Sequence, residues 1–251
     1  MNDQELAEHL ALETGKLLQK TFQENHASLT PNELGELGDQ TGHEFLLHEL
    51  SKLRPLDHVL SEEGEDNVGR LAANRVWIID PLDGTSHFSK GEKDYAVHIA
   101  LWEKGSAAKF QLIAAGVGVP ETNCVHGISN EIVTSDSDVV RVLVSATRPP
   151  VEMEQICEKL KAQFGQIQLI SMGSVGAKLS QIINGNADLY INTGGFFEWD
   201  IAAPAAVANA NGLIACHIDG KELTFNNPEV YVPNVVIGKP EFVQAVIKSL
   251  A

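Results

Sequence analysis

The chain has 251 residues, of which 43% are hydrophobic and 21% are charged, which is ordinary for a globular protein with a sizeable core. Acidic residues outnumber basic residues by 34 to 18, so the formal charge is -16. This charge repels DNA and RNA and excludes a nucleic-acid polymer as the expected partner, whereas a small anion can still bind where divalent cations reverse the local potential.

The N-terminus and the cysteines indicate a soluble, cytoplasmic protein. The first residues, MNDQELAEHL, are acidic where a secretory signal is basic. The apolar run 112–119 is too short to span a bilayer, so we expect no membrane segment. Cys124, Cys157 and Cys216 stand far apart without a Cys-x-x-Cys pair, which predicts neither a disulfide framework nor a structural zinc site.

Two helices followed by strands are predicted for the first half of the chain. Large apolar residues recur at helical spacing from Leu6 to Phe22, and again from Phe45 until Pro55 ends the pattern. Apolar segments bounded by turn residues then predict strands at 75–80, 96–103 and 110–119. We therefore expect a mixed α+β lobe over residues 1–130.

The second half alternates strands and helices after a polar, turn-rich stretch at 129–138. The segments RVLVSA, IQLIS, ADLYI and LIACHI are predicted strands. Helices are expected at 151–164, around 178–183, from Asp200 and at the C-terminus. This alternation predicts a layered α/β lobe over residues 131–251, and an α/β fold overall.

The segment WIIDPLDGT carries the strongest chemical signal. An apolar strand ends at Asp80, and Asp83, Gly84 and Thr85 follow. Mg²⁺ prefers carboxylate oxygens, and Asp80 and Asp83 can face one pocket with the Leu82 carbonyl as a third oxygen. The N–H groups of Gly84 and Thr85 are candidates for holding phosphate oxygens. A surface turn is the alternative, because Asp-Gly after a strand is a common turn signal.

Two further acidic segments are compatible with the same site. Glu62 and Glu63 follow an apolar pair, and a solvated acidic loop is the alternative there. Asp200 begins an Ala-rich helix, for which a simple N-cap is the alternative. Neither segment alone decides between a ligand and a structural role.

Together these segments resemble a known family. A Glu-Glu pair, Asp-Pro-Leu-Asp-Gly-Thr and Trp-Asp-x-Ala-Ala occur in that order between Glu62 and Ala203. This order resembles the signature of the inositol monophosphatase superfamily, and the similarity extends over essentially the whole chain. The resemblance implies a layered α/β/α/β/α sandwich of the inositol monophosphatase and fructose-1,6-bisphosphatase type, with an active site between two lobes.

The resemblance also implies metal ligands. Glu62, Asp80 and the Leu82 carbonyl would bind one Mg²⁺ ion, and Asp80, Asp83 and Asp200 would bind a second, with roughly two or three ions in all. One ion would activate a water molecule for attack on phosphorus, and another would neutralise the leaving oxygen. Inhibition by lithium is implied by the resemblance alone.

Two other segments resemble the CysQ-type bisphosphate nucleotidases, in the actinobacterial form. GSVGAK, with Ser174 and Lys178, matches their Gly-x-x-Gly-x-Lys segment, and VSATRPP places Arg148 where a nucleotide-contacting His stands. A cation away from the metals suits a substrate with a second phosphate. The implied reaction converts 3′-phosphoadenosine 5′-phosphate to AMP and phosphate in sulfur assimilation, with Gly84, Thr85, Arg148, Ser174 and Lys178 binding substrate. An exposed surface lysine is the alternative for Lys178.

A last candidate is Asp39, in the segment LGELGDQ. The superfamily carries a Thr-x-x-Asp segment whose Asp contacts the threonine of Asp-Gly-Thr, and here Glu36 replaces the upstream threonine. The resemblance implies that Asp39 accepts a hydrogen bond from Thr85, and that this pair acts with Glu62 on the attacking water. The alternative is that Asp39 merely caps a helix that runs on to Leu53.

Other functions remain open. Asn192 and the pair Ser86-His87 depart from the nucleotidase pattern, so inositol monophosphatase or fructose-1,6-bisphosphatase activity is the alternative within the superfamily. A haloacid-dehalogenase-type phosphatase is disfavoured, because one residue separates its two aspartates and two separate them here. A non-catalytic metal-binding protein of the same fold is the alternative of another class. The expected partner is a small phosphorylated substrate, and a homodimer is compatible with the sequence.

Overall fold

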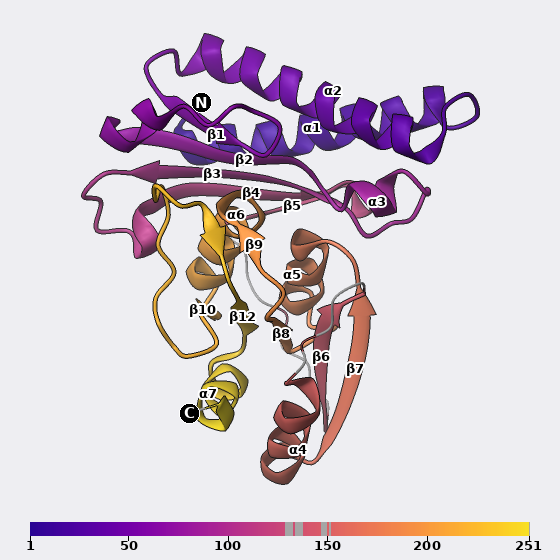
Figure 1. Ribbon diagram of the computed structural model, residues 1–251, viewed down its shortest axis with the longest axis vertical. Helices are drawn as coiled ribbons and strands as arrows, with labels where there is room; N and C mark the ends of the chain where they lie inside the picture. The colour runs from indigo at the N-terminus through magenta and orange to yellow at the C-terminus, as the bar shows by residue number, and fades with distance from the viewer. Residues whose placement is uncertain (129–132, 134–137, 147–149, 151, 251) are drawn as a thin grey trace.

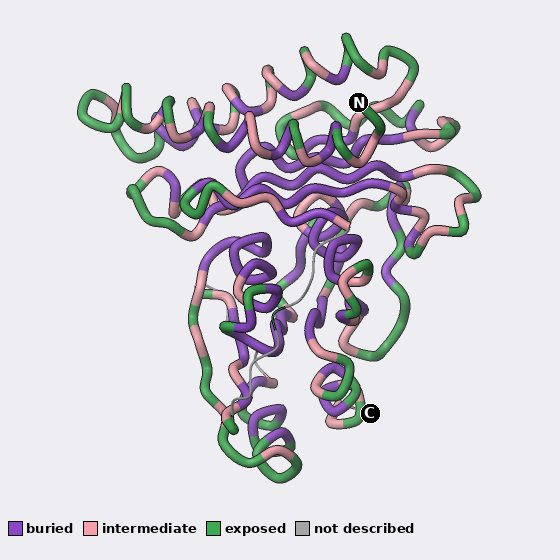
Figure 2. Tube along the Cα trace, turned by 180° about the vertical axis from the view of Figure 1, so that it is seen from behind, coloured by how far each residue is buried: buried purple, intermediate pink, exposed green. Residues whose placement is uncertain are grey.

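The computed structural model describes residues 1–128, 133, 138–146, 150 and 152–250. These residues stack in alternating helix, sheet, helix, sheet and helix layers (Figures 1 and 2). The layer order is the α/β/α/β/α sandwich expected from the sequence. The elements nearest the N-terminus form the outer helical layer and the first sheet.

The outer layer consists of helices α1 (Asp3–Asn25) and α2 (Pro31–Leu53). Each helix begins with a capping box, formed by Asn2 with Glu5 and by Thr30 with Glu33. Such boxes satisfy N–H groups that have no partner within the helix, and so they fix where each helix begins. In the part of the chain that the structure describes, no helix is long and apolar enough to cross a bilayer.

The first sheet has the order β1-β2-β3-β4-β5. Its strands are β1 (His58–Ser61), β2 (Arg75–Asp83), β3 (Ala96–Glu103), β4 (Leu112–Val119) and β5 (Cys124–Gly127). The pair β1–β2 is parallel and the other pairs are antiparallel. The strand predicted from residue 110 begins at Leu112 instead, because Lys109–Gln111 form the 3₁₀ helix η2 and Phe110 has a φ of 61°.

Helix α1 lies very close to β4. A Cβ at Gly116 would lie 2.7 Å from the backbone oxygen of Ala7, and one at Gly118 would lie 2.7 Å from that of Ala11. A side chain at either position would therefore collide with helix backbone that cannot move alone. The two glycines permit this close contact between the first two layers.

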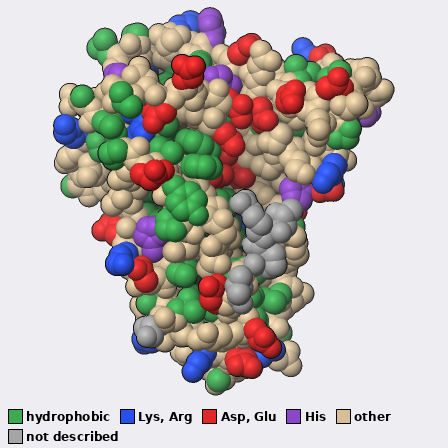
Figure 3. Space-filling view, viewed as in Figure 1, with side chains coloured by type: hydrophobic (Ala, Val, Ile, Leu, Met, Phe, Trp, Pro, Cys, Tyr) green, Lys and Arg blue, Asp and Glu red, His purple; other side chains and the backbone are tan. Residues whose placement is uncertain are grey.

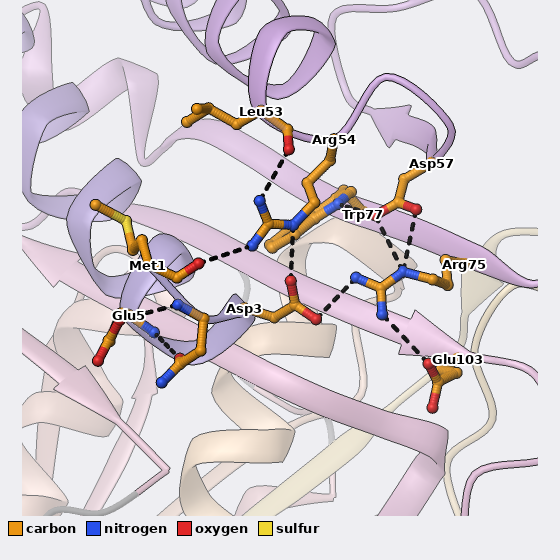
Figure 4. A network of polar contacts seen from close by, with 10 residues as sticks. Met1, Asp3, Glu5, Leu53, Arg54, Asp57, Arg75, Trp77 and Glu103 are labelled. Atoms are coloured by element: carbon orange, nitrogen blue, oxygen red, sulfur yellow. Dashed lines mark hydrogen bonds and ion pairs between the residues drawn. The ribbon is translucent and has the colours of Figure 1, made fainter.

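A polar network also joins the outer helices to the edge of the first sheet (Figure 4). Asp3 accepts hydrogen bonds from Arg54 Nε and Arg75 Nη2, each at 2.8 Å. Asp57 accepts from Arg75 Nε at 3.0 Å and from Trp77 Nε1 at 2.9 Å. The start of α1, the end of α2 and the start of β2 are thereby held together.

The second half of the chain forms a sheet of order β10-β12-β8-β6-β7 and the helices around it. In chain order its elements are β6 (Val139–Ser145), α4 (Met153–Phe164), β7 (Gln166–Met172), α5 (Val175–Ile183), β8 (Leu189–Asn192), β9 (Phe196–Phe197), α6 (Glu198–Ala210), β10 (Ile214–Cys216), β11 (Tyr231–Val232), β12 (Val235–Gly238) and α7 (Pro240–Leu250). Strands β9 and β11 pair separately. The expected lobe boundary at residue 130 lies outside the described residues and stays a prediction.

Helix α6 fills the space between the two sheets. It packs against β2, β3 and β4 on one side and against β10 on the other, and most of its residues are buried. A helix that is apolar on all sides is typical of such a central layer. Because α6 begins beside the first sheet, it carries Asp200 toward the end of β2.

Candidate active site

A pocket of about 250 Å³ opens where the end of β2 meets the beginnings of α5 and α6. The short helix α3 (Thr85–Phe88) forms part of its wall. Its lining residues include most of those predicted from the sequence: Glu62, Asp80, Leu82, Asp83, Gly84, Thr85, Ser174, Lys178 and Asp200. In the space-filling view, acidic side chains gather near the middle of this face (Figure 3).

Asp80, Asp83 and Asp200 form the centre of the pocket. One carboxylate oxygen from each lies within 4.8 Å of the other two. Residues three apart on a regular strand point to opposite faces, but the pairing of β2 with β3 is irregular between Asp80 and Asp83. Three steps along β2 match two steps along β3, so a bulge turns both carboxylates to one side.

Asp80 is fully buried, and only one of its two carboxylate oxygens accepts a hydrogen bond from the described residues. Its Oδ1 accepts a hydrogen bond from the Leu82 N–H at 3.0 Å, whereas Oδ2 has no hydrogen-bond partner among the described residues. Burial, with repulsion from Glu62 and Asp83, raises the pKa of Asp80 well above its usual value. A buried carboxylate oxygen without a donor fits a cation, since an unpaired buried charge is otherwise very costly.

Asp83 is held by the beginning of α5. Its Oδ2 accepts hydrogen bonds from Ser174 Oγ at 2.6 Å, Val175 N at 2.5 Å and Gly176 N at 3.1 Å. The N-terminus of a helix stabilises negative charge, so α5 offsets the repulsion that Asp83 experiences from its neighbours. The Ser174 hydroxyl therefore donates to a proposed metal ligand, and its predicted contact with substrate stays a prediction.

Asp200 lies in the first turn of α6. Its Oδ2 accepts a hydrogen bond from the Phe197 N–H at 2.7 Å, which closes a capping interaction. The simple N-cap alternative for Asp200 is wrong, because α6 begins two residues earlier at Glu198 with Phe197 as its N-cap. Asp200 is instead the third residue of the helix, and its carboxylate also belongs to the acidic cluster. Because a carboxylate has several acceptor positions, the two roles are compatible.

A buried polar chain connects the region after Glu62 to the start of α6. Arg70 is fully buried and donates to both oxygens of Asp66, at 2.6 and 2.9 Å, and to Asn226 Oδ1 at 2.8 Å. Glu198 accepts from the backbone N–H groups of Asn226 at 2.6 Å and Asn227 at 2.9 Å. These bonds fix the first residue of α6 and thereby the position of the cluster's third carboxylate.

Glu62 lines the pocket from the loop that follows β1. Although the residue as a whole is exposed, burial of its carboxyl group raises its pKa to about 8, with repulsion from Asp200 and Glu63 adding to the effect. Glu63 is also exposed and is absent from the pocket lining. This difference is consistent with Glu62 as the predicted ligand of the pair.

Asp39 and Thr85 are in contact. Thr85 Oγ1 lies 3.1 Å from Asp39 Oδ1 and 3.2 Å from the Leu82 carbonyl, so its hydroxyl can donate to either. Burial, with the charge of Glu63, raises the pKa of Asp39 to about 7. The capping alternative for Asp39 is wrong, because α2 begins at Pro31 with Thr30 as its cap. Glu36 is exposed on the same helix.

Lys178 is only 3% exposed, so the alternative of a surface lysine is wrong. Its ammonium donates to the carbonyls of Gly173 at 3.1 Å and Ser174 at 3.0 Å, and it lies 4.8 Å from the centre of the Tyr190 ring. Its predicted role toward a second phosphate stays a prediction. The other predicted cation, Arg148, lies outside the described residues.

Two histidines of the site were not predicted. His98, fully buried on β3, lies with Nε2 3.3 Å from Asp83 Oδ2 and Nδ1 3.9 Å from Asp80 Oδ2. His98 is the partner of Asp80 in the register of β2 and β3. This pairing could be predicted only with knowledge of the strand order in the sheet. His87 lines the pocket and was noted only as a departure from the nucleotidase pattern.

The clustered carboxylates should make the metal-free protein less stable as the pH rises. Unfolded Asp and Glu titrate at about 4, whereas the pKa of Asp39 is raised to about 7 and that of Glu62 to about 8. Between these values the folded state binds more protons than the unfolded state, so the free energy of unfolding falls with increasing pH. Urea denaturation in chelator at about pH 7 and about pH 8 should show this fall.

Measurements above about pH 7 separate the effect of the carboxyl groups on stability from the effect of the histidines, which titrate at lower pH. The pKa values of His43, His98 and His126 are lowered by burial, which makes stability rise with pH only below about 6.5. A Glu62→Gln control should show a smaller fall, and excess Mg²⁺ should reduce it by favouring the ionised carboxylates. Stability that increases from about pH 7 to about pH 8 in chelator would contradict this electrostatic description.

Comparison with known proteins agrees with this geometry. The pattern of the inositol monophosphatase family matches residues 2–250. A 3′-phosphoadenosine 5′-phosphate phosphatase of Mycobacterium tuberculosis is 41% identical over 229 residues, covering 88% of this chain and 83% of the relative. The 3′(2′),5′-bisphosphate nucleotidase CysQ of Escherichia coli K12 is 30% identical over 209 residues, covering 77% of this chain and 80% of the relative.

Solved structures agree in fold. The crystal structure of CysQ from Bacteroides thetaiotaomicron superposes with a TM-score of 0.75 at 23% identity, covering 92% of this chain and 94% of that one. That similarity confirms the layered α/β architecture expected from the sequence. Together with the family match over nearly the whole chain, it leads to one assignment: this protein belongs to the inositol monophosphatase family.

Proposed function

We propose that this protein is a Mg²⁺-dependent phosphatase that hydrolyses the 3′-phosphate of 3′-phosphoadenosine 5′-phosphate, giving AMP and phosphate. The observation that carries the proposal is the cluster of Asp80, Asp83 and Asp200, whose oxygens converge within 4.8 Å in a pocket. The choice of nucleotide is supported by the names of relatives that are 41% and 30% identical to this chain.

The donor set suits Mg²⁺, which takes oxygen ligands in a near-octahedral arrangement. Glu62, Asp80, Asp83, Asp200 and the Leu82 carbonyl are the proposed ligands. The Oδ2 atom of Asp80, which has no hydrogen-bond partner among the described residues, is the atom that best fits a cation. When bound, the metal supplies Lewis-acid stabilisation of the phosphate charge and activates water for the attack on phosphorus.

Thr85 and Asp39 are the proposed acceptors for the proton of the attacking water. The Thr85 hydroxyl donates to Asp39 at 3.1 Å, which leaves the threonine oxygen able to accept a proton from a water beside it. Asp39 then takes up the threonine proton, a role that suits a carboxyl group with a pKa of about 7. Thr85 lines the pocket that holds the acidic cluster, where the attacking water is needed, and Asp39 contacts it.

The Gly84–Thr85 turn is the proposed cradle for the reacting phosphate. Gly84 has a φ of 96°, and a Cβ there would lie 2.6 Å from the Asp94 carbonyl. Only glycine fits these two constraints without strain. The backbone of the turn can therefore approach the phosphate closely, with its N–H groups as donors.

Substrate preference tests the proposal directly. In Mg²⁺, kcat/KM for 3′-phosphoadenosine 5′-phosphate should exceed that for inositol 1-phosphate or fructose 1,6-bisphosphate by at least about tenfold, because one charge-assisted contact to a remote group contributes that much. Phosphate release should stop in excess chelator, and lithium should inhibit it. Asp83→Asn, which removes a proposed ligand, should abolish turnover of every substrate. Undiminished turnover in chelator, or a preference for a sugar phosphate, would contradict the proposal.

A second prediction concerns the proton acceptor. Asp39→Asn keeps the size of the side chain but cannot take up a proton, so kcat should fall roughly 10²- to 10⁴-fold. The Mg²⁺ concentration for half-maximal activity should change little, because Asp39 is not a proposed ligand. Glu36→Gln, an exposed change on the same helix, is the matched control and should leave kcat near the wild-type value. Near-normal kcat in a folded Asp39→Asn protein would remove Asp39 from the mechanism.

A further inference from the structure

The pocket has walls of two chemical kinds. Asp80, Asp83 and Asp200, with Glu62, make one wall acidic. Helices α3 and α5 contribute His87 and Lys178 to the lining. Among the described residues that line the pocket, only His87 and Lys178 can carry a positive charge.

Lys178 is directed into the protein. Its ammonium donates to the carbonyls of Gly173 and Ser174 and lies over the Tyr190 ring. These contacts fix the loop whose next residues bind Asp83. The charge of Lys178 contributes to the potential in the pocket, and these two hydrogen bonds hold its ammonium against the loop. The other candidate in the pocket lining for direct contact with an anion is His87.

His87 has the position and orientation for that contact. Its side chain is 19% exposed, and Nδ1 lies 2.5 Å from Glu92 Oε2. Glu92 is held in turn, because its own N–H donates to the His87 carbonyl at 2.9 Å. The Nδ1 contact fixes the ring, and a carboxylate at this distance requires the proton on Nδ1. Nε2 is the nitrogen without that contact, and it lies beside Gly173, which also lines the pocket.

Gly173 provides the space for this ring. A Cβ at Gly173 would lie 2.3 Å from His87 Nε2, so any other residue here would displace the imidazole. The Gly173 N–H donates to Asp94 at 3.0 Å, which fixes the glycine against the ring. When Nε2 also carries a proton, the ring can donate from this nitrogen to a phosphate oxygen on this side of the pocket.

We propose that His87, oriented by Glu92, binds the phosphate that is not cleaved, and so makes the site selective for bisphosphates over monophosphates. The inference rests on the proposed phosphatase function and names one recognition residue for it. The two phosphates of the substrate would lie apart, one at the acidic cluster and the other at the wall formed by α3 and Gly173.

The test compares two substrates that differ only in the second phosphate, 3′-phosphoadenosine 5′-phosphate and adenosine 3′-monophosphate. In the wild-type protein with Mg²⁺, KM should be lower for the bisphosphate. His87→Ala should raise KM for the bisphosphate about ten- to a hundredfold, the value of a lost charge-assisted hydrogen bond. KM for the monophosphate should stay within about twofold, and kcat for both should change little.

Three further variants complete the design. Lys90→Ala removes an exposed positive charge three residues away that does not line the pocket, and it should leave both KM values unchanged. Glu92→Gln should raise KM for the bisphosphate in the same direction but less, because the ring keeps a hydrogen-bond acceptor. His87→Gln serves if His87→Ala does not fold, and it should also raise KM for the bisphosphate alone.

The outcomes separate the two proposals. If the wild-type protein hydrolyses neither nucleotide, the proposed function fails. If it hydrolyses both, but His87→Ala and His87→Gln change KM for the two substrates equally or not at all, the inference about His87 is wrong and the function stands. An equal effect of Lys90→Ala would show that general charge, and not contact with His87, sets the preference.

Discussion

Repulsion among buried carboxylates is the constraint around which this structure is organised. Two unit charges about 4 Å apart repel by about 4 kcal/mol in surroundings of intermediate polarity, and the whole stability of a domain is only about 5–15 kcal/mol. Asp80, Asp83 and Asp200 converge within 4.8 Å, and Asp80 is fully buried. A cation bound among these carboxylates would offset their repulsion. Burial, with this repulsion adding to it, raises the pKa values of Asp80 and Glu62.

The fold supports this arrangement with rigid elements from both halves of the chain. The bulge in β2 turns Asp80 and Asp83 to one side, the beginning of α5 donates three hydrogen bonds to Asp83, and α6 supplies Asp200. Arg70 and Glu198 fix the first turn of α6 through the Asn226–Asn227 segment. The surrounding packing therefore holds a few carboxylates in positions that are unfavourable for local stability, which is typical of functional sites.

Short motifs carry the family resemblance, and that resemblance implied the layered fold and the acidic cluster. Each motif can be read from the sequence because it lies at the end of one regular element. Features that depend on contacts between distant segments were not predictable. The burial of Lys178 depends on the Tyr190 ring, which comes from another strand. The position of Asp39 in mid-helix depended on an earlier cap at Thr30. In the sequence, His98 is simply a residue of an apolar strand. Only the register between β2 and β3 places it beside Asp80 and Asp83.

The account depends above all on a cation binding among these carboxylates. Crystals grown with Mn²⁺, which shares the oxygen preference of Mg²⁺ and gives an anomalous signal, allow that position to be measured directly. We expect an anomalous peak within about 2.0–2.6 Å of oxygens from Asp80, Asp83 and Asp200. A map without a peak in this pocket, at a Mn²⁺ concentration that supports phosphate release, would contradict the account.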